Sequence, residues 1–130
     1  MIGLMAHYFA AADAVHFASA IVASPVGKAP LPLLMIQGIG DSFTPDITQD
    51  ALVRALRVPI VGDRVRDIAG VESVNSPIAN NVHHQTAGAL QYAPQGNYNG
   101  HFVVFSHPDA KRAVEHFLTT LLSGTPEIRR

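Results

Sequence analysis

The chain has 130 residues, of which 48% are hydrophobic and 15% are charged, and its net charge is −1. This composition is typical of one globular domain with a modest core and excludes an intrinsically disordered chain. Because the sequence has no basic block and no cysteine, we expect no nucleic-acid partner, no disulfide framework and no thiolate chemistry.

The N-terminal stretch, residues 1–22, is apolar and rich in alanine, with hydrophobic residues at helical spacing. We predict a buried amphipathic helix over these residues. The stretch has no basic start, and His7, Asp13 and His16 interrupt it. We therefore expect neither a secretory signal peptide nor stable membrane insertion.

The next stretch, residues 33–45, is the one around which the rest of the chain is organised. Its apolar start, residues 33–37, predicts a strand buried on both faces, as in a parallel sheet. Gly38 and Gly40 favour a sharp turn after that strand. Asp41 then lies in a loop at the carboxyl end of the strand, which is the edge where open α/β sheets place ligands and catalytic groups.

The rest of the chain alternates between helical and extended patterns. In chain order we predict a helix over 47–56, a short extended segment over 57–61, a long irregular excursion over 62–85, a strand over 86–92, a helix over 110–122 and a frayed tail over 124–130. Asp46 or Thr48 would cap the first of these helices. The fold predicted for residues 1–130 is a single α/β domain with a few-stranded, mainly parallel sheet flanked by helices. Its two main strands are joined right-handedly through the helix over 47–56.

Asp41 and His101 are the main candidates for chemistry, because both lie in glycine-flanked loops next to predicted strands. If the two strands are neighbours, the carboxylate can accept a hydrogen bond from the imidazole, fix its tautomer and stabilise its protonated form. We expect the two side chains within hydrogen-bond reach. The alternative is that Asp41 caps a turn and His101 is an ordinary loop histidine.

These two motifs, as an ordered pair, resemble the C-terminal part of an α/β-hydrolase of the bacterial secreted esterase and lipase type. The family places its acid in a Gly-x-x-Asp-x-x-Thr/Val-Pro pattern, and its histidine in Gly-His-Phe before a closing helix. The matching residues are Gly38, Asp41, Thr44, Pro45, Gly100, His101 and Phe102. Residues 13–18 are also similar to a segment that precedes the acid strand in large esterases of this type. Together the matches extend over about residues 13–122.

The resemblance implies a partial α/β-hydrolase fold and hydrolysis of a carboxylic ester, either a small ester or a lipid, through an acyl-enzyme. His101 would be the general base and acid, and Asp41 would orient it. The resemblance implies no cofactor and no metal, and proteins of this family are often secreted.

The family's nucleophilic serine is not evident in the chain. No Gly-x-Ser-x-Gly motif is present, and neither Ser19 nor Ser24, the two serines that precede Asp41, has that setting. The serine would therefore come from an N-terminal hydrolase portion, from another chain or from Ser42. Gly40-Asp41-Ser42 resembles the nucleophile block of Gly-Asp-Ser-Leu esterases, although their other blocks are not identifiable.

A second reading treats the chain as a non-catalytic α/β module. A strand that is apolar on both faces needs partners on both sides, so we expect a homo-oligomer or a complement that carries the nucleophile. The remaining histidines do not change these readings. His83 and His84 would point opposite ways in an extended segment and so would not bind one metal, and we expect His7, His16 and His116 to be packing or surface residues.

Overall fold

The computed structural model describes residues 10–27 and 29–130. Its centre is a four-stranded parallel sheet in the order β1-β4-β2-β3. The strands are β1 (Leu33–Gly38), β2 (Ile60–Val61), β3 (Ser73–Val74) and β4 (Ala87–Tyr92). The predicted α/β fold with a mainly parallel sheet is confirmed, and β2 and β3 are short additions to the two main strands.

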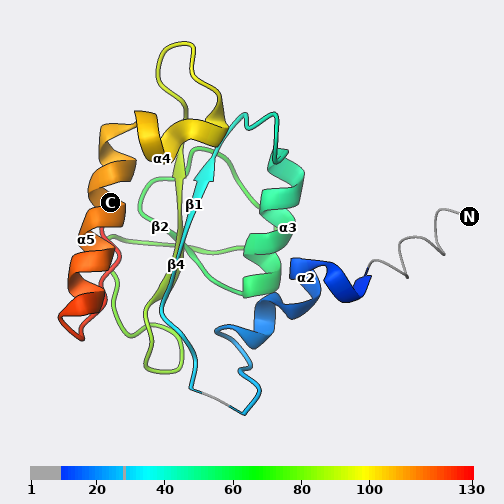
Figure 1. Ribbon diagram of the computed structural model, residues 1–130, viewed down its shortest axis with the longest axis vertical. Helices are drawn as coiled ribbons and strands as arrows, with labels where there is room; N and C mark the ends of the chain where they lie inside the picture. Colours follow the sequence, from blue (N-terminus) through cyan, green and yellow to red (C-terminus); the bar gives the residue numbers. More distant parts are fainter. Residues whose placement is uncertain (1–9, 28) are drawn as a thin grey trace, which may run out of the picture.

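Helices cover both faces of this sheet and make a three-layer arrangement (Figure 1). On one face lie α2 (Ala14–Phe17) and α3 (Asp46–Leu56), and on the other lie α4 (Val103–Ser106) and α5 (Pro108–Leu122). Alternate residues of β1 contribute to the two cores: Met35 packs on the side of α3, and Ile36 packs on the side of α5. The strand is thus apolar on both faces, as its sequence predicts.

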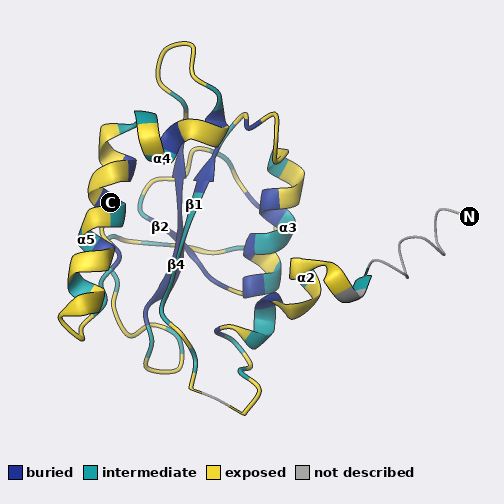
Figure 2. Ribbon diagram, viewed as in Figure 1, coloured by how far each residue is buried: buried dark blue, intermediate teal, exposed yellow. Residues whose placement is uncertain are grey.

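β1 and β4 are adjacent and parallel over their whole length, from the pair Leu33↔Ala87 to the pair Gly38↔Tyr92. All six residues of β4 are buried, whereas most of β1 is only half-buried (Figure 2). The difference follows from their positions, since β4 lies between β1 and β2, and β1 is at the edge of the sheet. The two strands expected to carry the acid and the histidine are therefore neighbours that end at the same side.

The predicted continuous helix over residues 1–22 is wrong within the described residues, and residues 1–9 lie outside them. Short pieces replace it: a 3₁₀ turn over Ala10–Ala12, then α2, then a second 3₁₀ turn over Ala18–Ala20. The break has a local cause, because the Asp13 carboxylate accepts a hydrogen bond from the Val15 N–H at 3.0 Å and so starts a new helix.

The C-terminal segment over 124–130 is not frayed, which corrects a second prediction. Ile128 is fully buried and forms an antiparallel bridge with Ile78. The hydroxyl of Thr86 donates to the carbonyl of Pro126 at 2.6 Å. The tail therefore closes one side of the core, and it does so against the excursion over 62–85, which has little regular structure as predicted. Among the described residues, no helix has the length and hydropathy needed to cross a membrane.

Candidate functional site

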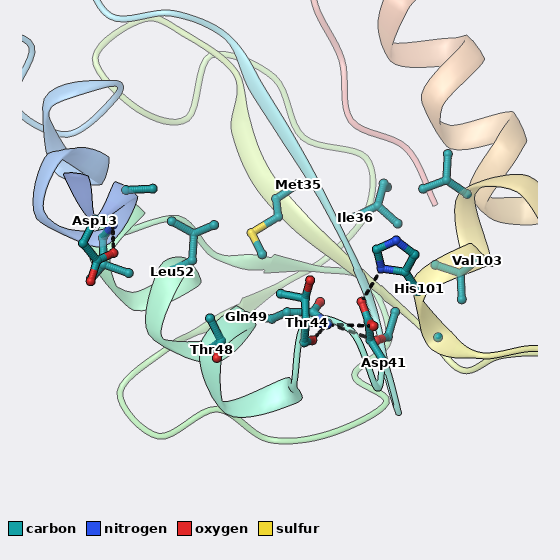
Figure 3. A pocket seen from close by; sticks show the side chains of 15 residues that line it. Asp13, Met35, Ile36, Asp41, Thr44, Thr48, Gln49, Leu52, His101 and Val103 are labelled. Atoms are coloured by element: carbon teal, nitrogen blue, oxygen red, sulfur yellow. Dashed lines mark hydrogen bonds and ion pairs between the residues drawn. The ribbon is translucent and has the colours of Figure 1, made fainter. Parts of the chain in front are cut away.

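The predicted pair forms at the carboxyl ends of β1 and β4, where the loops that follow the two strands meet. Nδ1 of His101 lies 3.0 Å from Oδ2 of Asp41. The aspartate side chain is 6% exposed and the histidine side chain is 44% exposed. The contact joins positions sixty residues apart, as expected if the acid and histidine loops leave neighbouring parallel strands (Figure 3).

The Asp41 carboxylate is held by its own backbone as well as by the imidazole. Oδ1 accepts the N–H groups of Phe43 at 2.7 Å and of Thr44 at 2.9 Å. Burial would raise the pKa of this carboxyl group, but the hydrogen bonds from Thr44, Phe43 and His101 outweigh burial and lower it. Asp41 is therefore an ionised acceptor with a fixed orientation near neutral pH.

Two glycines allow the acid and histidine loops to touch. A Cβ atom on Gly38 would lie 1.9 Å from the Gly100 carbonyl oxygen, and one on Gly100 would lie 2.5 Å from the Ile39 carbonyl oxygen. The sequence suggested that Gly38 helps to form the turn, but the structure uses it for this close approach. Gly40, with φ of +76°, makes the turn.

Asn99 connects the same two loops through its side-chain amide. Its Oδ1 accepts the N–H of His101 at 2.9 Å and the N–H of Ser42 at 3.3 Å, and its Nδ2 lies 2.7 Å from the Ser42 hydroxyl oxygen. Both loops are thus fixed relative to each other before any ligand arrives. The sequence does not predict this role, because asparagine next to glycine is common in turns.

The second ring nitrogen of His101, Nε2, has no hydrogen-bond partner within the part of the chain that the structure describes. Aromatic rings flank the imidazole: the ring centroid of Phe43 lies 4.9 Å away and that of Phe102 lies 5.1 Å away. An imidazole with Nδ1 on a carboxylate and Nε2 open is arranged to accept a proton at Nε2.

A cavity of about 360 Å³ reaches this pair. Its walls come from α2, α3, α4 and both faces of β1, so it runs over the open edge of the sheet. Figure 3 shows the side chains that line it. The apolar ones include Met35, Ile36, Leu52, Val103 and Val104, and the polar ones include Asp41, Thr44, Thr48, Gln49 and His101.

The other sequence candidates among the described residues form no hydrogen bond with the Asp41 carboxylate or with the His101 ring. The Ser42 hydroxyl is held by Asn99 and makes no hydrogen bond with the His101 ring. His83 and His84 have left-handed backbone angles, and the described residues contain no group of side chains able to hold a metal ion. His116 pairs with Glu127 in the C-terminal segment.

The predicted caps of the first main helix are also corrected. Neither Asp46 nor Thr48 caps α3, whose N-cap is Pro45 and has no side-chain hydrogen bond. The Asp46 carboxylate instead accepts the N–H of Gly40 at 3.0 Å. It belongs to a network with Gln37, Asp50, Arg66 and Gln91, which is described below. The sequence carries a signal for this polar network, because Gln37 and Gln91 each interrupt an apolar strand.

Comparison with protein-family models, with curated proteins and with solved structures finds no significant match to this chain.

Proposed function

We propose that this chain supplies the acid and the histidine of an ester-hydrolysing site of the α/β-hydrolase type. The observation that carries the proposal is the 3.0 Å contact between the buried Asp41 carboxylate and Nδ1 of His101, beside a cavity with apolar walls. A histidine so oriented takes a proton from a nucleophile through Nε2 and later returns it to the leaving alcohol. The substrate is a small ester or a lipid ester, whose acyl part suits apolar walls.

In this proposal His101 is the general base and acid, and Asp41 stabilises the imidazolium as it forms. An acyl-enzyme needs a serine, and no Gly-x-Ser-x-Gly motif exists in this sequence. A further strand that paired with the open edge of β1 would bring such a serine next to the site. Successive N–H groups along a strand point to opposite sides. Leu33 and Ile39 donate to the β4 side, so the N–H groups of Leu34 and Ile36 point to the open edge.

The experiment measures hydrolysis of p-nitrophenyl acetate and butyrate by the purified chain beside His101→Ala. Exposed imidazoles attack activated esters without any site, so the matched control is His84→Asn. His84 is exposed and has φ of +64°, which asparagine tolerates. With no Gly-x-Ser-x-Gly serine in the sequence, His101 would act in the purified chain as a general base that activates water. We expect a rate that survives His84→Asn and is lost in His101→Ala. Equal losses in the two variants would overturn the proposal.

A second candidate function is a non-catalytic module that assembles through its sheet. The observation that favours it is the edge position of β1, which pairs on one side only among the described strands and carries apolar residues on both faces. Symmetric pairing of two copies through β1 would cover the open β1 edge of each copy. Sedimentation equilibrium at micromolar concentration tests this candidate: a homodimer supports it, and a species of single-chain mass contradicts it.

A further inference from the structure

A ring of hydrogen bonds lies directly below the loop that carries Asp41. Gln37 donates to Oδ1 of Asp50 at 2.7 Å, and Gln91 donates to Oε1 of Gln37 at 2.9 Å. Gln91 Oε1 in turn accepts the N–H of Arg66 at 3.1 Å. The Arg66 guanidinium closes the ring on Oδ2 of Asp50 at 2.5 Å. One ring therefore joins β1, β4, α3 and the excursion over 62–85.

Three of the four residues of the ring are buried, and the side chain of Arg66 is 35% exposed. Gln37, Gln91 and Asp50 are all less than 5% exposed, and the described residues contain no buried side-chain nitrogen or oxygen without a partner. Such networks seldom add stability beyond what apolar side chains of the same size would give. They do hold their members in one arrangement, because breaking any bond leaves a buried polar group unsatisfied.

Asp46 links this ring to the candidate site. Its Oδ2 accepts from the Arg66 guanidinium at 2.8 Å, and its Oδ1 accepts the N–H of Gly40 at 3.0 Å. Gly40 immediately precedes Asp41 in the chain. The guanidinium thus orients the Asp46 carboxylate, and that carboxylate fixes the peptide from which the Asp41 side chain departs.

We propose that Arg66, acting through Asp46, is a positioning residue for the Asp41–His101 pair. A role of Arg66 in catalysis rests on the function proposed above, whereas an effect of Arg66 on the geometry of the Asp41–His101 pair does not. A displacement of the Asp41 carboxylate by about 1 Å would take its oxygen out of hydrogen-bond range of His101 Nδ1. Arg66 acts on that carboxylate indirectly, through Asp46 and the Gly40 peptide, whereas the backbone N–H groups of Phe43 and Thr44 donate to it directly.

The tautomer of neutral His101 reports directly on this geometry. An acceptor at Nδ1 requires the proton to reside on Nδ1, so the bound Asp41 carboxylate selects the Nδ1–H form. Without that acceptor the imidazole in water reverts to a mixture dominated by the Nε2–H form. The ¹⁵N chemical shifts of the two ring nitrogens, measured at a pH of about 9 where an ordinary imidazole is neutral, distinguish the two forms.

The experiment compares three variants of the full chain with the parent. Asp46→Ala cuts the link to Gly40 and leaves the ring of Gln37, Asp50, Arg66 and Gln91 in place. Arg66→Met removes the guanidinium. Arg64→Met is the matched control in the same loop, because among residues 10–27 and 29–130 Arg64 bonds only to Asp67 and to the carbonyl of Val71.

We expect the parent and Arg64→Met to hold His101 in the Nδ1–H form, and Asp46→Ala and Arg66→Met to shift it toward Nε2–H. If Arg66→Met does not fold, Asp46→Ala decides the matter, since its ring is intact. A parent-like tautomer in folded Asp46→Ala or in folded Arg66→Met would overturn the proposal and leave Arg66 a structural residue only. The measurement needs no ester hydrolysis, so absence of activity in the assay above would leave its result interpretable.

Discussion

Two histidine–carboxylate pairs lie in different parts of this molecule and have almost the same length. Nδ1 of His101 is 3.0 Å from Asp41, and Nε2 of His116 is 2.9 Å from Glu127. The Asp41 side chain is 6% exposed and that of Glu127 is 27% exposed. The Asp41 pair joins the ends of two strands, whereas the Glu127 pair ties the C-terminal segment to α5. Distance alone therefore does not mark a site.

The surroundings of the two acids make the difference. Both pKa values lie below the ordinary range, for different reasons. The pKa of Glu127 is lowered first by the hydrogen bond from His116, against the opposing effect of burial, and then by Arg129. For Asp41 burial is the largest influence and would raise the pKa, yet its hydrogen bonds outweigh it, and the backbone N–H groups are the foremost of these. Asp41 is held by the chain that carries it, and Glu127 depends on other side chains.

The spaces beside the two pairs also differ in character. A cavity of about 510 Å³ lies beside His116, and most of the residues that line it are charged or polar, with Arg112, Arg129 and Arg130 among them. The cavity beside His101 has mostly apolar walls. A buried, fixed acid, an open Nε2 and apolar walls occur together only at the first of these two pairs, and that combination supports the functional proposal.

The largest expected effect comes from neutralising the two acids in turn. We expect Asp41→Asn to lower His101-dependent ester hydrolysis to the rate of His101→Ala. The asparagine amide would favour the wrong imidazole tautomer while leaving the fold intact. Glu127→Gln should leave the rate unchanged. Initial rates on p-nitrophenyl butyrate check both, and an equal loss in the two variants would erase the contrast between the pairs.

The next largest effect concerns what holds the C-terminal segment. Ile128 is fully buried, so Ile128→Ala should lower the free energy of unfolding by about 2–5 kcal/mol through lost burial and a residual cavity. Leu122→Ala is the matched control, because Leu122 is 90% exposed, and it should change stability by less than about 0.5 kcal/mol. Urea denaturation followed by circular dichroism measures both. A small effect of Ile128→Ala would mean that the Glu127–His116 pair, and not the core, secures the tail.

Acid should weaken the fold through both carboxylates. A carboxyl group whose pKa is lower in the folded state stabilises that state fully above the unfolded pKa, about 4. This stabilisation is lost as the pH falls through the lowered folded value. We therefore expect urea midpoints to decline below a pH of about 4. The decline should be shallower in Asp41→Asn and in Glu127→Gln than in the parent, and a parent-like slope in Asp41→Asn would show that its hydrogen bonds do not favour the ionised form.

Much of the site was accessible from the sequence because it depends on local patterns. An apolar run followed by glycines predicts a buried strand and a turn, and parallel strands bring their following loops to one edge. Those rules allow Asp41 and His101 to meet, and the resemblance of the two motifs to those of α/β-hydrolases favours the contact over the alternative of a turn cap and a loop histidine. Their contact at 3.0 Å confirms the predicted proximity.

The parts that were missed depend on long-range partners. Ile128 appears in a short polar tail that looks frayed, and only its antiparallel bridge with Ile78 orders it. Arg66 lies in a segment without periodicity, and its role depends on Asp46 and Asp50, which are distant in sequence. The break at Asp13 was visible in principle, because aspartate is a strong N-cap residue, but the alanine-rich pattern around it outweighed that signal.

The smallest expected effect concerns Ser42, the one serine next to the acid. Its hydroxyl oxygen lies 2.7 Å from Nδ2 of Asn99, an amide that donates and cannot accept a proton. A serine that attacks an ester needs a base at its hydroxyl, and His101 makes no hydrogen bond with it. We therefore expect Ser42→Ala to retain His101-dependent hydrolysis within about twofold and, as an exposed substitution, to change stability by less than about 0.5 kcal/mol. Asn99→Ala should have the larger effect on the rate, since it frees the N–H groups of Ser42 and His101 together. Loss of hydrolysis in Ser42→Ala, with Asn99→Ala still active, would make Ser42 the nucleophile and would complete the site within this chain.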